Sequence, residues 1–213
     1  MDFAANIPSR RRVEISAQYY ERETWACFNV TTHTQENGYQ YWDFLAPVNT
    51  PKNSAFVKSA MDVWAAMATI PSSVRSLHFW SDGGAHIKNA VVLMSSISVA
   101  RGLGRDCEVF YFASYHGKSQ CDRHFGAISR ARKRASFDIL SIRDVAMLIN
   151  TTLHNSVAVD HSSGPREPPQ LDRKIQGMRS LFQVTPMPGD DLLLRRRPME
   201  RGDVMVAPTF ALN

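Results

Sequence analysis

The 213 residues, 44% of them hydrophobic, are enough for one domain with its own core and a smaller appendage. With 25 basic and 20 acidic side chains the net charge is +5, which favours a polyanionic partner such as nucleic acid. No run of roughly 20 apolar residues and no secretory leader is visible, and the three cysteines lack CxxC spacing, which argues against a membrane protein and a disulfide scaffold. We therefore expect a soluble protein from a reducing compartment.

The first fifty residues have the pattern of antiparallel strands. A short apolar stub surrounds Phe3, and β-branched and aromatic residues are frequent in residues 13–34. The turn residues at 36–38 then predict a hairpin, whose returning strand spans residues 39–48. We expect three sequential antiparallel strands here.

The next segment alternates helical and extended patterns. Apolar side chains recur at three- and four-residue steps in residues 51–70, which predicts an amphipathic helix, and residues 74–80 form a short apolar strand. A second helix is predicted over residues 87–104, closed by two glycines. Residues 109–115 are an unbroken apolar and aromatic run, as expected of a strand covered on both faces.

Two further helices and a linker follow. Helical patterns span residues 119–136 and 137–150, which completes a predicted domain over residues 1–150. Residues 151–170 contain the Pro- and Gly-rich stretch of a linker. Short apolar runs in residues 171–213 predict a small β-rich appendage or tail.

This order of elements predicts an α/β fold with a mixed sheet flanked by helices, and it is the order of the ribonuclease H-like fold. In that fold one carboxylate lies on strand one, a second at the end of strand four, and a third near the start of the helix after strand five. Asp2, Asp82 and Asp122 occupy those positions. Because strands one and four are neighbours in such a sheet, we expect these acids to converge.

Three converging carboxylates would form a two-metal site for Mg²⁺ or Mn²⁺, because hard divalent cations prefer oxygen ligands. Each aspartate also has a structural interpretation, as a turn former or, for Asp122, as an acid in the first turn of a helix. Asp138 and Asp144 are alternative candidates for the third carboxylate.

Three sequence blocks around these acids resemble a known family. They are Met1 to Asn6 (MDFAAN), Ser81 to Gly84 (SDGG) with Ile87-Lys88-Asn89, and His116-Gly117-Lys118 with Cys121-Asp122 and Gly126. They are similar to blocks of eukaryotic transposon-derived proteins with a DDE transposase domain, and residues 14–20 resemble a weaker fourth block. The resemblance covers roughly residues 1–135. It implies a metal-dependent DNA strand-transfer nuclease with Asp2, Asp82 and Asp122 as catalytic metal ligands.

The chain departs from that family at two points. The match begins at the initiator methionine, without the family's N-terminal DNA-binding region, which suggests a truncated or domesticated copy. Ala5 stands where the family block more often has an acidic residue.

Basic side chains near these blocks predict contacts with a phosphate backbone. The residues expected to bind nucleic acid are Lys88, His116, Lys118, Arg123, Arg130 and Lys133. A solvated helix face is the alternative for the last three. The triplets Arg10-Arg11-Arg12 and Arg195-Arg196-Arg197 either extend a basic track or act as nuclear-import signals, so we expect nuclear localisation. Cys121, His124 and His86 are a weaker alternative as zinc ligands.

The sequence therefore predicts in-line attack by water or a DNA 3′-hydroxyl on a phosphodiester. DNA is the expected partner, with self-association or a second protein for DNA targeting. One alternative is a non-catalytic DNA-binding or regulatory protein derived from a transposase. Another is a ribonuclease H-like nuclease that acts on RNA or on branched DNA.

Overall fold

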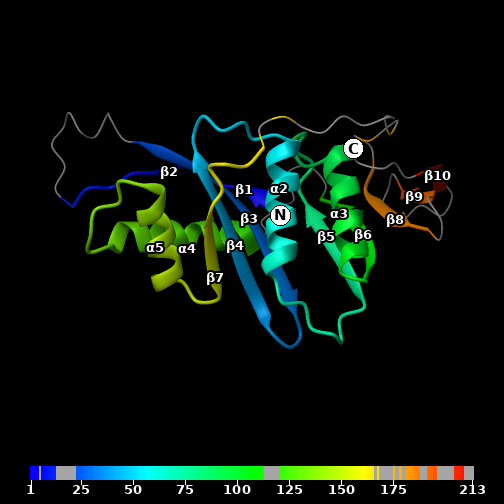
Figure 1. Cartoon of the computed structure of the whole chain (residues 1–213), viewed down its shortest axis with the longest axis horizontal. Helices are drawn as coiled ribbons and strands as arrows, with labels where there is room; N and C mark the ends of the chain where they lie inside the picture. Colours follow the sequence, from blue (N-terminus) through cyan, green and yellow to red (C-terminus); the bar gives the residue numbers. More distant parts are fainter. Residues whose placement is uncertain are drawn as a thin grey trace. The chain divides into compact units, whose positions relative to one another are not determined.

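A computed structural model describes residues 1–4, 6–12, 23–112, 120–165, 167, 175, 178, 181–187, 191–195 and 204–208 (Figure 1). It confirms an α/β fold with mixed sheets and helices. The chain forms two compact units, the first from residues 1–50 and 118–164 and the second from residues 51–117 and 165–213. None of the described helices combines the length and the apolar character that a membrane crossing requires.

The first unit is built on a sheet of five strands. Their order is β1-β3-β4-β7, and β2 also pairs with β3. All pairs are antiparallel except β4 with β7, which is parallel. Gly38 closes the β3–β4 hairpin with a φ of +62°, a left-handed conformation that favours glycine. The strands are β1 (Asp2–Phe3), β2 (Ile7–Pro8), β3 (Thr24–Thr34), β4 (Gly38–Pro47) and β7 (Ser156–Asp160).

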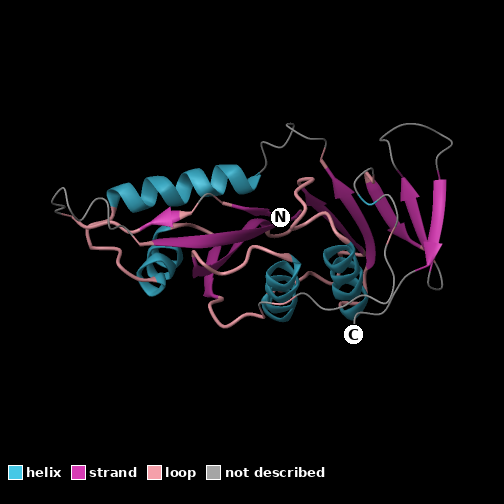
Figure 2. Cartoon of the chain, turned by 90° about the horizontal axis from the view of Figure 1, so that it is seen from above, coloured by secondary structure: helices cyan, strands magenta, loops and turns pink. Residues whose placement is uncertain are grey.

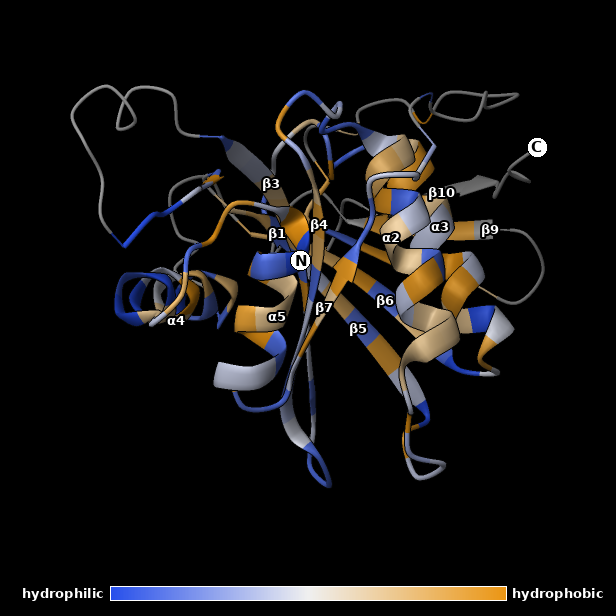
Figure 3. Ribbon diagram, turned by 60° about the vertical axis from the view of Figure 1, so that its left-hand side comes forward, coloured by the Kyte–Doolittle hydropathy of each residue, from blue (hydrophilic) through white to orange (hydrophobic). Residues whose placement is uncertain are grey.

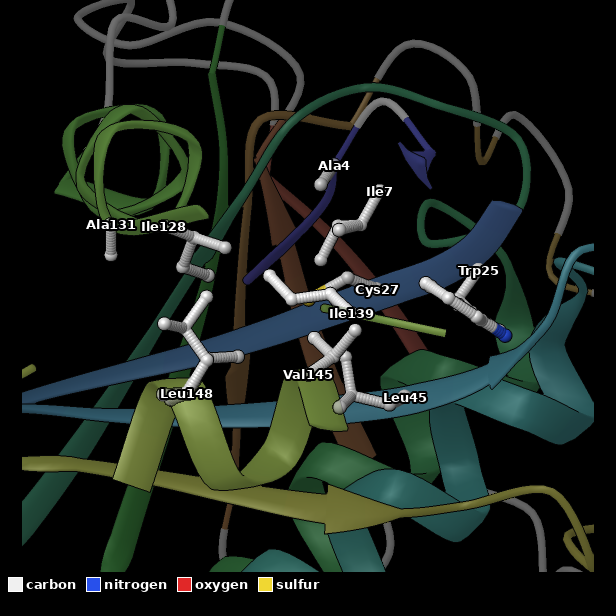
Figure 4. Packing of buried hydrophobic residues seen from close by; sticks show 11 residues of the cluster. Ala4, Ile7, Trp25, Cys27, Leu45, Ile128, Ala131, Ile139, Val145 and Leu148 are labelled. Atoms are coloured by element: carbon white, nitrogen blue, oxygen red, sulfur yellow. The ribbon is translucent and has the colours of Figure 1, made fainter. Parts of the chain in front are cut away.

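Helices α4 (Gln120–Arg134) and α5 (Ile142–Thr152) pack on one face of this sheet. In Figure 2, α4 runs alongside the strands of its unit. Cys27 and Leu45 of the strands share a buried cluster with Ile128 of α4 and Leu148 of α5 (Figure 4). Burial of each large aliphatic side chain contributes about 1.5–3 kcal/mol, so this cluster holds both helices on the sheet.

The second unit has its own five-stranded sheet of order β10-β9-β8-β6-β5. Its β5 and β6 are parallel, and the other pairs are antiparallel. Figure 3 shows alternating hydrophobic and hydrophilic residues along β5 and β6, and hydrophobic stretches on α2 and α3. Helix α3 packs on β5 and β6, and α2 packs on α3. The elements are α2 (Ser54–Met67), β5 (Ser76–Ser81), α3 (Ala90–Gly102), β6 (Asp106–Tyr111), β8 (Gln183–Pro186), β9 (Asp191–Arg195) and β10 (Val204–Pro208).

Asparagine side chains begin two of these helices. The Asn53 Oδ1 atom accepts the Phe56 backbone N–H at the start of α2. Asn89 caps α3 in the same way, with its Oδ1 accepting the Val92 N–H at 3.0 Å. Each cap satisfies a backbone donor that the first helical turn leaves without a partner.

The arrangement differs from the sequence prediction in three respects. Residues 151–170, predicted as a linker, contain β7, which pairs with β4. The strands of residues 171–213 do not form a separate appendage, because β8 pairs with β6. Third, β1 and β5 belong to different sheets, because the two residues of β1 pair with β3 and β5 pairs with β6. The strand pairing that would bring Asp2 beside Asp82 is therefore not provided by the described sheets.

Candidate functional site

A row of three polar residues crosses the sheet of the first unit. Asp2 of β1 lies opposite Asn29 of β3, and Asn29 lies opposite Asp43 of β4. Directly opposed residues of antiparallel strands point to the same face, so all three side chains lie on one face of the sheet. Asp2 is half-buried, whereas Asn29 and Asp43 are fully buried.

Helix α4 completes this row through His124. The His124 Nε2 atom lies 2.6 Å from Asp43 Oδ2, and both side chains are buried. The other Asp43 oxygen accepts the Asn29 Nδ2–H at 2.9 Å. The His124 ring also stacks on Tyr41, with centroids 4.2 Å apart and planes 6° apart. The pair therefore fixes the N-terminal half of α4 on the sheet.

Smaller contacts extend the same network. The Thr31 hydroxyl donates to Asn29 Oδ1 at 2.6 Å and lies 3.4 Å from Cys121 Sγ of α4. The Cys27 thiol lies 3.6 Å from Asp43 Oδ1. These contacts give Cys121 and His124 partners within the protein, and this favours a packing role over the alternative of zinc ligands.

Asp122 lies in the first turn of α4, between Cys121 and His124. Cys121 and His124 are buried, whereas Asp122 and Arg123 between them are exposed. The network thus attaches the helical turn that carries Asp122 to the sheet face on which Asp2 lies. Two of the three predicted carboxylates, Asp2 and Asp122, belong to the same unit.

The third carboxylate, Asp82, belongs to the second unit and directly follows β5. Its Oδ1 accepts the Gly84 N–H at 3.1 Å, which forms a tight turn. A Cβ atom on Gly84 would lie 2.8 Å from the His86 ring and 3.2 Å from Asp82 Oδ1, so a larger residue here would displace the His86 side chain. The turn presents Asp82 at the carboxyl end of two parallel strands, a common position for binding sites in α/β proteins.

A lysine and a tyrosine accompany Asp82 at this end of the sheet. The Lys88 Nζ lies 5.0 Å from the centroid of the Tyr111 ring, a cation–π distance. Burial lowers the pKa of the Lys88 ammonium and raises the pKa of the Tyr111 hydroxyl. Tyr111 lies opposite Ser81 in the β5–β6 pair, and Ser81 directly precedes Asp82 in the chain. Lys88 is thus a half-buried cation near the predicted metal ligand of this unit.

Among the described residues, no group of three or more His, Cys, Asp or Glu side chains is arranged to hold a metal ion. The assignment of Asp2, Asp82 and Asp122 as catalytic metal ligands stays a prediction. The two alternative acids have structural contacts: Asp138 Oδ1 accepts the Arg12 N–H, and Asp144 Oδ2 accepts the Leu140 N–H and the Ser141 hydroxyl.

The predicted cations fall into three groups. On α4, Arg123, Arg130 and Lys133 are exposed, as expected of residues that contact a phosphate backbone. His116 and Lys118 lie outside the described residues, as do Ala5, the block at 14–20 and two arginines of the second triplet. In the triplet Arg10-Arg11-Arg12, the Arg10 Nη1 atom donates to the Ala135 carbonyl just after α4, and this contact gives Arg10 a structural role.

Sequence reasoning did not single out the Asn29–Asp43 pair, and it considered His124 only as a zinc ligand. The one signal in the sequence is an acidic residue inside the apolar run of β4, between Trp42 and Phe44. A buried carboxylate of this kind needs a partner. The sequence does not indicate which distant residue supplies it.

The chain belongs to the family described as Domain of unknown function (DUF8701), whose model matches residues 1–163. This match includes all of the first unit apart from its last residue, Gly164, and the part of the second unit up to Gly117. No curated protein and no solved structure matches the chain.

Proposed function

We propose that this member of the family is a metal-dependent enzyme that cleaves or joins DNA phosphodiesters, derived from a DDE transposase with a ribonuclease H-like fold. The observation that carries the proposal is the buried Asp43–His124 pair. It holds the turn of α4 that carries Asp122 on the sheet face where Asp2 lies. A ribonuclease H-like site needs this relation between its first and third carboxylates.

The donor set suits hard divalent cations, because all three acids offer carboxylate oxygens. Asp2, Asp82 and Asp122 are the residues that would hold Mg²⁺ or Mn²⁺. Bound ions of this kind activate a water or hydroxyl nucleophile and stabilise the departing oxygen. Full transposition would require parts beyond these residues.

The remaining contribution of the chain is to bind the DNA backbone. Arg123, Arg130 and Lys133 lie on α4, the helix that carries Asp122, and all three are exposed. Their contacts to phosphates would be independent of base sequence and would weaken as salt rises. Lys88 would add a cation beside Asp82, and His116 and Lys118 would act before the start of α4.

Nicking of supercoiled plasmid tests the proposal. Wild-type protein with Mg²⁺ or Mn²⁺ should relax the plasmid, and EDTA should abolish this activity. Asp82→Asn should lower the nicking rate on the order of 100-fold or more, because bound metal ions stabilise the charged transition state by several kcal/mol. Asp62→Asn is the matched control, since Asp62 is exposed on α2 and pairs with Lys58 in a helical turn. Equal rates for the two variants would contradict the proposal.

A second candidate is a non-catalytic DNA-binding protein of the same origin. It is favoured by the contact between Asp82 Oδ1 and the Gly84 N–H, because this turn gives Asp82 a role without metal. The exposed cations of α4 would bind DNA equally well without an intact metal site. Salt-sensitive DNA binding in EDTA, together with no nicking under any metal, would support this candidate over the enzyme.

A further inference from the structure

A cavity of about 410 Å³ lies between the C-terminal parts of α4 and α5, within the first unit. Its apolar lining includes Phe137, Leu148 and Leu153, and two arginines one helical turn apart, Arg130 and Arg134, also line it. Both arginines are exposed, and none of the described residues that line the cavity is acidic. The cavity therefore combines an apolar lining with concentrated positive charge.

This combination matches the chemistry of a nucleotide. A base offers a flat apolar face that stacks on aromatic rings or guanidinium planes, and its phosphate offers the negative charge that arginine binds. The volume is also within the range of about 300–1,000 Å³ found for small-ligand sites. The carbonyl end of α4 would repel a phosphate, but Arg10 Nη1 donates to the Ala135 carbonyl at 2.7 Å and offsets part of that charge.

The position of the cavity along α4 relates it to the proposed cleavage site. With a rise of 1.5 Å per residue, Arg130 lies about 12 Å and Arg134 about 18 Å along the helix axis from Asp122. An extended single strand of a few nucleotides is long enough to span this separation. A strand that passes Asp122 along α4 would reach the cavity.

We infer that this cavity binds an unstacked nucleotide of a single DNA strand, with the base against the apolar lining near Phe137 and the phosphate on Arg130 and Arg134. The identity of the polymer rests on the proposed function, whereas the binding itself requires neither metal nor cleavage. A base inside a duplex has both faces covered by its neighbours, so the cavity selects single-stranded or locally opened DNA.

Fluorescence anisotropy in EDTA tests this inference with a labelled thymidine 20-mer and a duplex of equal length. Wild-type protein should bind the single strand more tightly than the duplex. Thr152→Trp places a large ring in the cavity from an exposed position at the end of α5. It should weaken single-strand binding by about 5- to 150-fold, the range expected for one lost stacking contact, and leave duplex binding unchanged.

Two charge variants keep the test valid if Thr152→Trp fails to fold. Arg134→Gln should reduce the preference for the single strand, whereas Lys133→Gln, an exposed neighbour that does not line the cavity, should weaken both DNA forms by the same factor. Equal wild-type affinity for the two DNA forms would overturn the inference. Competition with polyglutamate gives a second such outcome. If polyglutamate displaced the labelled oligonucleotide as effectively as an unlabelled strand of equal charge, the cavity would be a site for acidic peptides and the inference would be overturned.

The outcomes also separate this inference from the proposed enzyme. Single-strand preference that depends on Arg134, without any nicking, would leave the cavity assignment standing and reject the nuclease. Nicking without a preference for the single strand would support the nuclease and reject the cavity assignment.

Discussion

Replacing His124 by phenylalanine tests the importance of the buried pair. Phenylalanine keeps a planar ring that can stack on Tyr41, but it removes the Nε2 atom that lies 2.6 Å from Asp43 Oδ2. Asp43 is fully buried and would keep only the Asn29 amide and the weak Cys27 thiol as partners among the contacts described above. Breaking a buried pair by removing one partner costs about 3–5 kcal/mol.

For a chain of this size, each kcal/mol lowers the melting temperature by about 2–4 °C, so we expect a decrease of about 6–20 °C. Thermal denaturation followed by circular dichroism at pH 7.5 measures it. His154→Phe is the control, because His154 is exposed in the loop before β7 and should change the melting temperature little.

A double variant distinguishes the buried charge from lost packing. Asp43→Asn combined with His124→Phe removes the buried charge along with its partner, so this double variant should be more stable than His124→Phe alone. A loss below about 1 kcal/mol for His124→Phe would refute the reasoning. Additive losses in the double variant would refute it equally.

Three further predictions concern other described residues. Burial lowers the pKa of His161, so as the pH falls below about 6.5 the unfolded chain protonates this imidazole before the folded chain does. The free energy of unfolding should therefore decrease with falling pH until the pH passes the folded pKa. Urea denaturation measures this decrease, and His161→Gln should lack the part that His161 contributes. Burial raises the pKa of the Cys107 thiol to about 12, and Cys27 and Cys121 are also buried, so Ellman's reagent at pH 8 should label all three only after unfolding; rapid labelling of the folded chain would contradict this. Asn89→Ala should cost about 1 kcal/mol in thermal denaturation by removing the α3 cap, whereas Asn89→Asp should retain most of the stability.

The elements with strong local signals were predictable from the sequence. Helix α2 lies within the predicted residues 51–70, because its apolar side chains repeat at helical spacing. The β3–β4 hairpin was predictable because Asn37 and Gly38 are favourable turn residues. Strand β7 has only five residues, and its pairing with β4 is more than a hundred residues distant along the chain, so no local pattern identifies it.

The candidate site shows the same contrast. The turn at Asp82 and Gly84 could be predicted from the adjacent sequence, because an aspartate followed by glycines after a strand is a local turn pattern. The contact between Asp43 and His124 joins residues 81 apart in the sequence, and it depends on how α4 packs on the sheet. Tertiary packing of this kind leaves little trace in the spacing of either residue.

The family match ends at residue 163, before the last three strands of the second unit. Residues 1–163 include Asp2, Asp82, Asp122, the buried pair and all of α4, whereas β8, β9 and β10 lie beyond them. Those three strands complete the sheet of the second unit by pairing β8 with β6 and so cover an edge that would otherwise be open. The matched residues thus include the whole proposed site, while the last strands would contribute through the stability of the sheet that carries Asp82.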